Sequence, residues 1–171
     1  MILSQKTNLS GTSLIEATIA ACTSALFLAS LFSMNMTGMK TIRTAREASS
    51  ASQVLQQRVE SMRIANWHQV TDADWLKSNL LNSEAAGSNG LKQMTETLTL
   101  VPYGSSTVGS TQIVRTGGTT TIVTPAAARP ALLAESAMKV IWTVDYSGGI
   151  NSKPTSRQTV AILAKGGVAK W

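Results

Sequence analysis

The chain is poor in the residue types from which most active sites and metal centres are built. Among its 171 residues, Cys22 is the only cysteine and His68 the only histidine. A lone cysteine forms no intrachain disulfide, and these two side chains are too few for a metal site of histidines and cysteines. A nucleophile–histidine–acid site would have to use the one imidazole. We therefore expect no enzyme activity, no metal and no cofactor.

Aromatic residues are also scarce, at 5% of the chain. Proteins that bind single-stranded nucleic acid stack bases on aromatic side chains within a basic groove. The formal net charge here is +6, but the basic residues are scattered from Lys40 to Lys170. A scattered surplus of this kind indicates a solvated surface. Nucleic acid is therefore not expected as a partner.

The acidic residues offer one candidate cation site. Asp72, Asp74 and Glu84 would together present several oxygen ligands. The segment 148–154, in contrast, contains Asn151 but no acidic residue, so we expect no calcium there.

What the chain does have is one long uncharged run, from Ala17 to Met39, with Glu16 at its start. Roughly 20 apolar residues suffice to cross a bilayer, whereas the apolar core of a secretory signal has only about 7–15. A carboxylate at the edge of the hydrocarbon is costly unless a partner neutralises it. The next basic residue, Lys40, lies on the order of 36 Å away along a helix that rises ~1.5 Å per residue. Glu16 is therefore a candidate functional residue whose partner comes from elsewhere.

The residues around Glu16 resemble a known processing signal. The sequence GTSLIE, from Gly11 to Glu16, followed by a long apolar helix, is similar to the class III signal of type IV prepilins and type II secretion pseudopilins. The resemblance implies that a prepilin peptidase cuts after Gly11 and methylates the new terminal amine of Thr12. It also implies that Glu16, the fifth residue of the mature chain, is the acid used in filament assembly. Thr12 stands where the family usually has phenylalanine.

The same resemblance implies a minor subunit of a filament and a set of partners. These are sister pilin or pseudopilin subunits, the prepilin peptidase, the inner-membrane assembly machinery and membrane lipid. The chain would be a single-pass protein of the inner membrane with its C-terminal domain in the periplasm, later assembled into a periplasmic or surface filament. The positive-inside rule favours the opposite orientation, because Lys40, Arg43 and Arg46 outnumber Lys6.

Two other function classes stay open. The first is a static single-pass anchor that carries an extracytoplasmic partner-binding domain. The second is an anchored enzyme, which the small stock of catalytic side chains makes the weakest of the three. The residues do not separate a pilus from a secretion system.

Beyond the apolar run, the spacing predicts that the helix continues as one rod from Ser13 to about Ala65. Apolar residues recur at helical intervals at Ile42, Ala45, Ala48, Leu55, Val59 and Met62. The spacings of Arg43 with Glu47 and of Glu60 with Arg63 predict two ion pairs on the helix surface.

Small polar residues lie in the outer part of the span, at Ser30, Ser33, Asn35 and Thr37. Their side chains could bond back to helix carbonyls. Alternatively, they could make the helix easier to extract from the bilayer during assembly. The residues favour neither interpretation.

The C-terminal part changes to the period of a β-sheet. Two β-branched runs, 111–116 and 119–124, flank Gly117-Gly118 and predict a hairpin. Further strands are predicted at 96–101, 139–146 and 158–163, the second with Val140, Trp142, Val144 and Tyr146 facing a core. A short helix is expected over 73–81, and the connection 125–137 is expected to contain one helical turn after Pro130.

The sequence thus predicts an α+β fold, in which a long N-terminal helix packs on a C-terminal antiparallel sheet of about four strands. This pilin-like architecture is also what the resemblance implies. The expected organisation is a cleaved leader (1–11), a membrane-spanning and filament-core helix (12–39), its amphipathic continuation (40–66) and a globular sheet domain (67–171).

Overall fold

The computed structural model describes residues 13–105, 109–148 and 153–166. The chain divides into two compact units, Met1–Thr41 and Ile42–Trp171. One helix, α1 (Leu14–Ile64), supplies residues to both. Its bounds confirm the predicted rod. The 51 residues of α1 include no proline and a single glycine, Gly38, so nothing in the sequence interrupts the helical hydrogen bonds.

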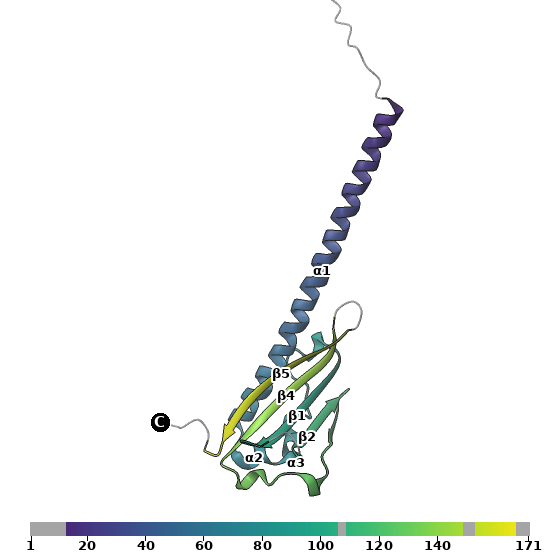
Figure 1. Ribbon diagram of the computed structural model, residues 1–171. Coiled ribbons are helices and arrows are strands. Elements are labelled where there is room, and N and C mark those ends of the chain that lie inside the picture. The colour runs from purple at the N-terminus through teal and green to yellow at the C-terminus, as the bar shows by residue number, and fades with distance from the viewer. Residues whose placement is uncertain (1–12, 106–108, 149–152, 167–171) are drawn as a thin grey trace, which may run out of the picture. The chain divides into compact units, whose positions relative to one another are not determined.

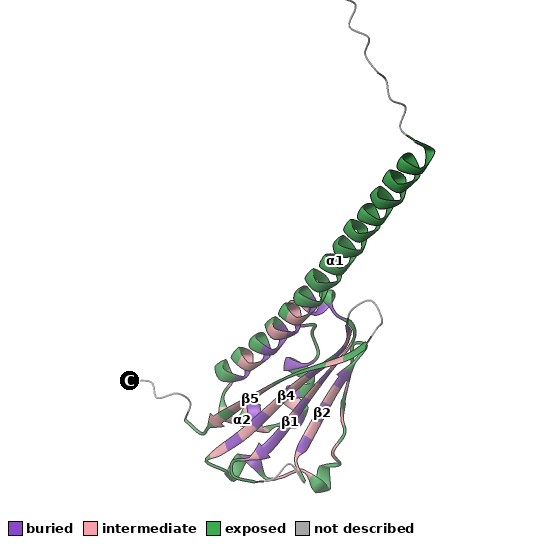
Figure 2. Ribbon diagram, turned by 45° about the horizontal axis from the view of Figure 1, so that its top comes forward, coloured by how far each residue is buried: buried purple, intermediate pink, exposed green. Residues whose placement is uncertain are grey.

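In the first unit, every described residue of α1 is exposed, as the green ribbon in Figure 2 shows. Several hydroxyl groups of this part donate to carbonyl groups of the same helix. Ser30 Oγ donates to the Phe27 carbonyl at 2.7 Å, and Thr37 Oγ1 donates to the Ser33 carbonyl at 3.0 Å. Thr18 and Thr23 bond in the same way. The interpretation that these small polar groups bond back to the helix is confirmed at Ser30 and Thr37.

In the second unit, α1 buries one face against the sheet domain (Figure 2). The buried residues are Glu47, Ala51, Val54, Leu55, Arg58 and Met62. Leu55 and Met62 belong to the predicted stripe, but Ile42 is 55% exposed, Ala45 is exposed, and Glu47, expected off the stripe, is buried. The predicted face was wrong at Ile42 and Ala45 because they precede Glu47, the first buried residue of α1. It was wrong at Glu47 because a charged side chain with an ionic partner occupies part of the buried face.

Short helices connect α1 to the sheet. They are α2 (Trp67–Thr71), α3 (Ala73–Trp75), the π-helical turn η1 (Leu76–Leu80) and the 3₁₀ turn η2 (Ser88–Gly90). Asn66 and Gln69 form a capping box that begins α2, and the Asp72 side chain accepts from the Asp74 N–H to begin α3. The helix expected over 73–81 corresponds to α3 and η1 together.

Five strands form one antiparallel sheet in the order β3-β2-β1-β4-β5 (Figure 1). Their bounds are β1 (Lys92–Pro102), β2 (Thr111–Thr116), β3 (Thr119–Ile122), β4 (Ala137–Gly148) and β5 (Lys153–Ala164). Gly117 and Gly118 join β2 to β3 with φ angles of +56° and +85°, which L-residues with side chains rarely adopt. The predicted hairpin and antiparallel strands are confirmed.

The connection between β3 and β4 holds two 3₁₀ turns, η3 (Ala126–Ala128) and η4 (Leu132–Ala134). The second is the helical turn expected after Pro130.

The core lies between the inner face of the sheet and the elements that cover it. Along β4, residues alternate between buried and less buried positions, and Val140, Trp142, Val144 and Tyr146 point inward as predicted. They join buried leucines of β1, of the connector and of α1 in one cluster. The fold is α+β, with a long helix packed on an antiparallel sheet.

Candidate functional site

The sequence predicted a processing and assembly site at Gly11, Thr12 and Glu16. Gly11 and Thr12 lie outside the described residues, so cleavage and methylation there stay predictions. Glu16 is described and lies exposed in the first turn of α1.

The backbone around Glu16 is a helix start. Ser13 Oγ accepts a hydrogen bond from the Glu16 N–H at 3.3 Å, which makes Ser13 the N-cap and Glu16 the third helical residue. The partial positive charge at the N-terminal end of the helix also stabilises a carboxylate at this position. The Ser-x-x-Glu spacing was the signal for this local role, and the sequence interpretation missed it.

The surroundings of Glu16 are apolar and exposed. Leu14 is 86% exposed, Ile15 70% and Ile19 58%. By length and composition, α1 contains a stretch near the N-terminus that is long and apolar enough to cross a membrane. Within the part of the chain that the structure describes, no group forms a hydrogen bond or ion pair with the Glu16 carboxylate. That Glu16 has a partner from elsewhere stays a prediction.

A buried ionic cluster in the second unit was not predicted. Arg58 of α1 donates from Nε to Glu96 Oε2 at 2.8 Å and from Nη2 to Glu96 Oε1 at 3.1 Å. Arg115 of β2 donates from Nη1 to Glu96 Oε1 at 3.2 Å. The side chains of Arg58 and Arg115 are 3% and 5% exposed, and that of Glu96 is 0% exposed.

Arg58 also ties the connector to the helix. Its Nη1 donates to the Leu80 carbonyl, and its Nη2 donates to the Ser83 carbonyl at 2.8 Å. One guanidinium therefore joins α1, β1 and the segment after η1. A buried charge is tolerated when its hydrogen bonds are made, and Arg58 meets this condition.

Two sequence signals could have revealed this cluster. Arg58 follows Val54 by four residues and precedes Met62 by four, so it lies on the buried helical face. Glu96 alternates with Leu98 and Leu100 in the predicted strand, which places all three on one face. An acid and a base on two faces that pack together predict an ion pair.

The other candidates do not form a site. Asp72 caps α3, Asp74 pairs with Arg129 at 3.4 Å, and Glu84 pairs with Arg115 at 3.6 Å. The described residues hold no group of three His, Cys, Asp or Glu side chains that could bind a metal ion, so the three acids do not act together. His68 is exposed beside Trp67, whose Nε1 donates to the Leu133 carbonyl at 3.2 Å.

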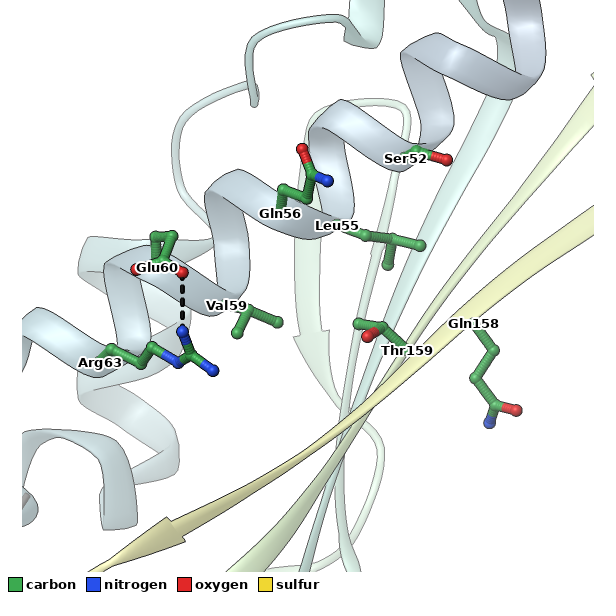
Figure 3. A pocket seen from close by; sticks show the side chains of 8 residues that line it. All are labelled: Ser52, Leu55, Gln56, Val59, Glu60, Arg63, Gln158 and Thr159. Carbon is green, nitrogen blue, oxygen red and sulfur yellow. Dashed lines mark hydrogen bonds and ion pairs between the residues drawn. The ribbon is translucent and has the colours of Figure 1, made fainter. Parts of the chain in front are cut away.

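A shallow hollow of about 290 Å³ lies between the second half of α1 and β5 (Figure 3). Leu55 and Val59 form its apolar side, and Thr159 faces them from β5. At its rim, Arg63 pairs with Glu60 at 2.9 Å, which confirms the second predicted ion pair. Arg43 and Glu47 form the first, at 3.0 Å. The hollow brings together no nucleophile with a base, and it offers no catalytic arrangement.

In three comparisons, the chain matches no protein-family model, no curated protein and no solved structure. The residues and their geometry therefore carry the functional argument.

Proposed function

We propose that the chain is a structural subunit, a minor pilin or minor pseudopilin, of a type IV pilus or type II secretion filament. The observation that carries this proposal is the position of Glu16. It is the single acid before an uncharged run in the exposed first half of a 51-residue helix, and it follows Gly11 at the spacing of a prepilin signal. The α+β domain behind that helix agrees with the proposal.

In this proposal, the apolar half of α1 lies first in the inner membrane, with the sheet domain in the periplasm, and then in the filament core. A prepilin peptidase removes residues 1–11 and methylates Thr12. The terminal amine of Thr12 then neutralises Glu16 on an adjacent subunit. Because cleavage creates this cation, uncleaved chains lack the docking group. No catalytic activity is part of the proposal.

The first test is processing. In cells with a prepilin peptidase, the chain should lose residues 1–11 and begin with a methylated Thr12. Intact-mass measurement of the membrane-extracted protein reads both changes at once. A leader that is retained, or a cut beyond Ala17, would exclude a processed filament subunit.

The second test is substitution of Glu16. Losing one member of a buried ion pair typically costs about 3–5 kcal/mol, whereas alanine inserts into a membrane more easily than glutamate. Glu16→Ala should therefore insert normally but lose crosslinks between neighbouring subunits in membranes, and Glu16→Asp should be intermediate. Glu60→Ala, which changes an exposed acid on the same helix, is the matched control and should crosslink like the wild type.

A static membrane anchor is the second candidate function. It is favoured by the place of Glu16 in the first turn of α1, since the positive end of the helix dipole stabilises a carboxylate there without a partner subunit. If Glu16→Ala leaves crosslinking unchanged while cleavage fails, this function becomes the better account.

A further inference from the structure

Arg58 and Arg115 belong to one buried cluster, but their guanidinium groups are not equally satisfied. The Nε and Nη2 atoms of an arginine lie on one side of the group and can bind two oxygens of one acid. Arg58 uses this side for both oxygens of Glu96, at 2.8 and 3.1 Å. Arg115 contacts Glu96 only through Nη1.

The corresponding side of Arg115 lacks good acceptors among the described residues. Its Nε is buried and has no hydrogen-bond partner. Its Nη2 lies 3.6 Å from Glu84 Oε1, which is an ion-pair distance but too long for a hydrogen bond. A buried donor without an acceptor is costly, and native proteins rarely retain one without a reason.

The charges around Arg115 are also unbalanced. Two buried guanidinium groups share the single buried carboxylate of Glu96. The remaining acid, Glu84, has a side chain that is 65% exposed, so water screens its charge. The cluster therefore carries an excess positive charge on the Arg115 side.

Arg115 lines a hollow of about 460 Å³ beside the β2–β3 turn. Its lining is mixed: polar groups come from Ser88, Asn89 and Gln93, and apolar side chains from Leu91 and Met94. Glu84 also lines this hollow, and its exposed side chain is free to rotate into water at small cost. The volume is enough for a small ion, and Arg115 supplies the positive charge.

We propose that Arg115 and this hollow bind an oxyanion with two oxygens in one plane, a carboxylate or a phosphate, which takes the Nε–Nη2 side of Arg115 in place of Glu84. Glu84 is then a competitor that the incoming anion displaces. The site lies wholly within the second unit and does not depend on the proposed filament function.

The test compares melting temperatures of the full chain in detergent micelles as sodium phosphate or sodium acetate replaces sodium chloride at constant ionic strength. A bound anion stabilises the folded state in proportion to the logarithm of 1 + [anion]/Kd, so the melting temperature rises with a dependence set by the site, whereas a general salt effect is the same in all variants. Glu84→Gln removes the competitor, so it should reach the same rise in melting temperature at roughly two- to five-fold lower anion concentration than the wild type. Glu135→Gln, an exposed acid elsewhere, should match the wild type.

Arg115→Lys keeps a charge beside Glu96 but cannot offer two donors in one plane, and its melting temperature should show only the general salt effect. A rise with acetate as well as phosphate assigns carboxylate recognition, and a rise with phosphate alone assigns phosphate. Identical curves for the wild type, Glu84→Gln and Glu135→Gln would overturn the proposal. The comparison of the wild type, Glu84→Gln and Glu135→Gln tests the proposal even if Arg115→Lys fails to fold.

Discussion

The two halves of α1 place their side chains in opposite ways. From residue 13 to 41 the apolar side chains are all exposed, while the hydroxyls of Ser30 and Thr37 are bonded inside the helix. From residue 42 to 64 the buried face includes two charged residues, Glu47 and Arg58. The first half is thus long and apolar enough to lie in an apolar surrounding such as lipid. The second half supplies both apolar and ionic contacts to its own domain.

The ionic contacts of the second half of α1 are tested most strongly by removing the buried carboxylate of Glu96. Glu96→Ala leaves Arg58 and Arg115 in the core without their shared acid, and we expect it to cost about 3–5 kcal/mol of the free energy of unfolding. Denaturant unfolding of the full chain in micelles, followed by tryptophan fluorescence, to which the buried Trp142 contributes, measures this loss. A loss under about 1 kcal/mol would mean that the cluster contributes little to the domain.

Two leucine-to-alanine substitutions, one in the core of the sheet domain and one in the first half of α1, compare buried with exposed apolar side chains. Leu98 is fully buried, and Leu98→Ala should cost about 2–5 kcal/mol because it leaves a cavity. Leu28 is 53% exposed in the first half of α1, and Leu28→Ala should change the same unfolding transition by less than about 0.5 kcal/mol. Equal losses in the two variants would show that the first half of α1 and the core of the sheet domain do not differ in packing as described.

The smallest expected effect concerns the exposed ion pair of Glu60 and Arg63. Both side chains are more than half exposed, at 61% and 55%. Glu60→Gln should lower the free energy of unfolding by about 0.2–1 kcal/mol, and the loss should shrink further at high salt. The same denaturant titration at two salt concentrations checks this. An effect as large as that of Glu96→Ala would contradict the contrast between buried and exposed pairs.

Much of the fold follows from local sequence signals. The rod is predictable because no proline interrupts it, and the hairpin because Gly117-Gly118 supplies two left-handed residues between β-branched runs. The inward face of β4 follows from strict alternation. Glu16 was found as a candidate because a charge beside a long apolar run is unusual, and its role in assembly stays a prediction.

The buried face of α1 was predicted less well. The helical pattern was drawn through apolar residues alone, which assigned Ile42 and Ala45 to the core and Glu47 to the solvent. A charged residue is buried when its partner is close in space, and that information is not local. Glu96, the partner of Arg58, is 38 residues away along the chain. Arg115 was missed for the same reason, since its environment depends on how β1, β2 and the connector come together.

The separation of Arg58 from Glu96 also has a consequence for how the chain is made. At synthesis rates of about 5–20 residues per second, Glu96 emerges roughly 2–8 seconds after Arg58, which lies 38 residues before it. During that interval Arg58 lacks the carboxylate that it contacts in the folded domain. Trp142, on β4, is made later still. The buried cluster and the core around it can therefore form only after β1 and β4 have been synthesised.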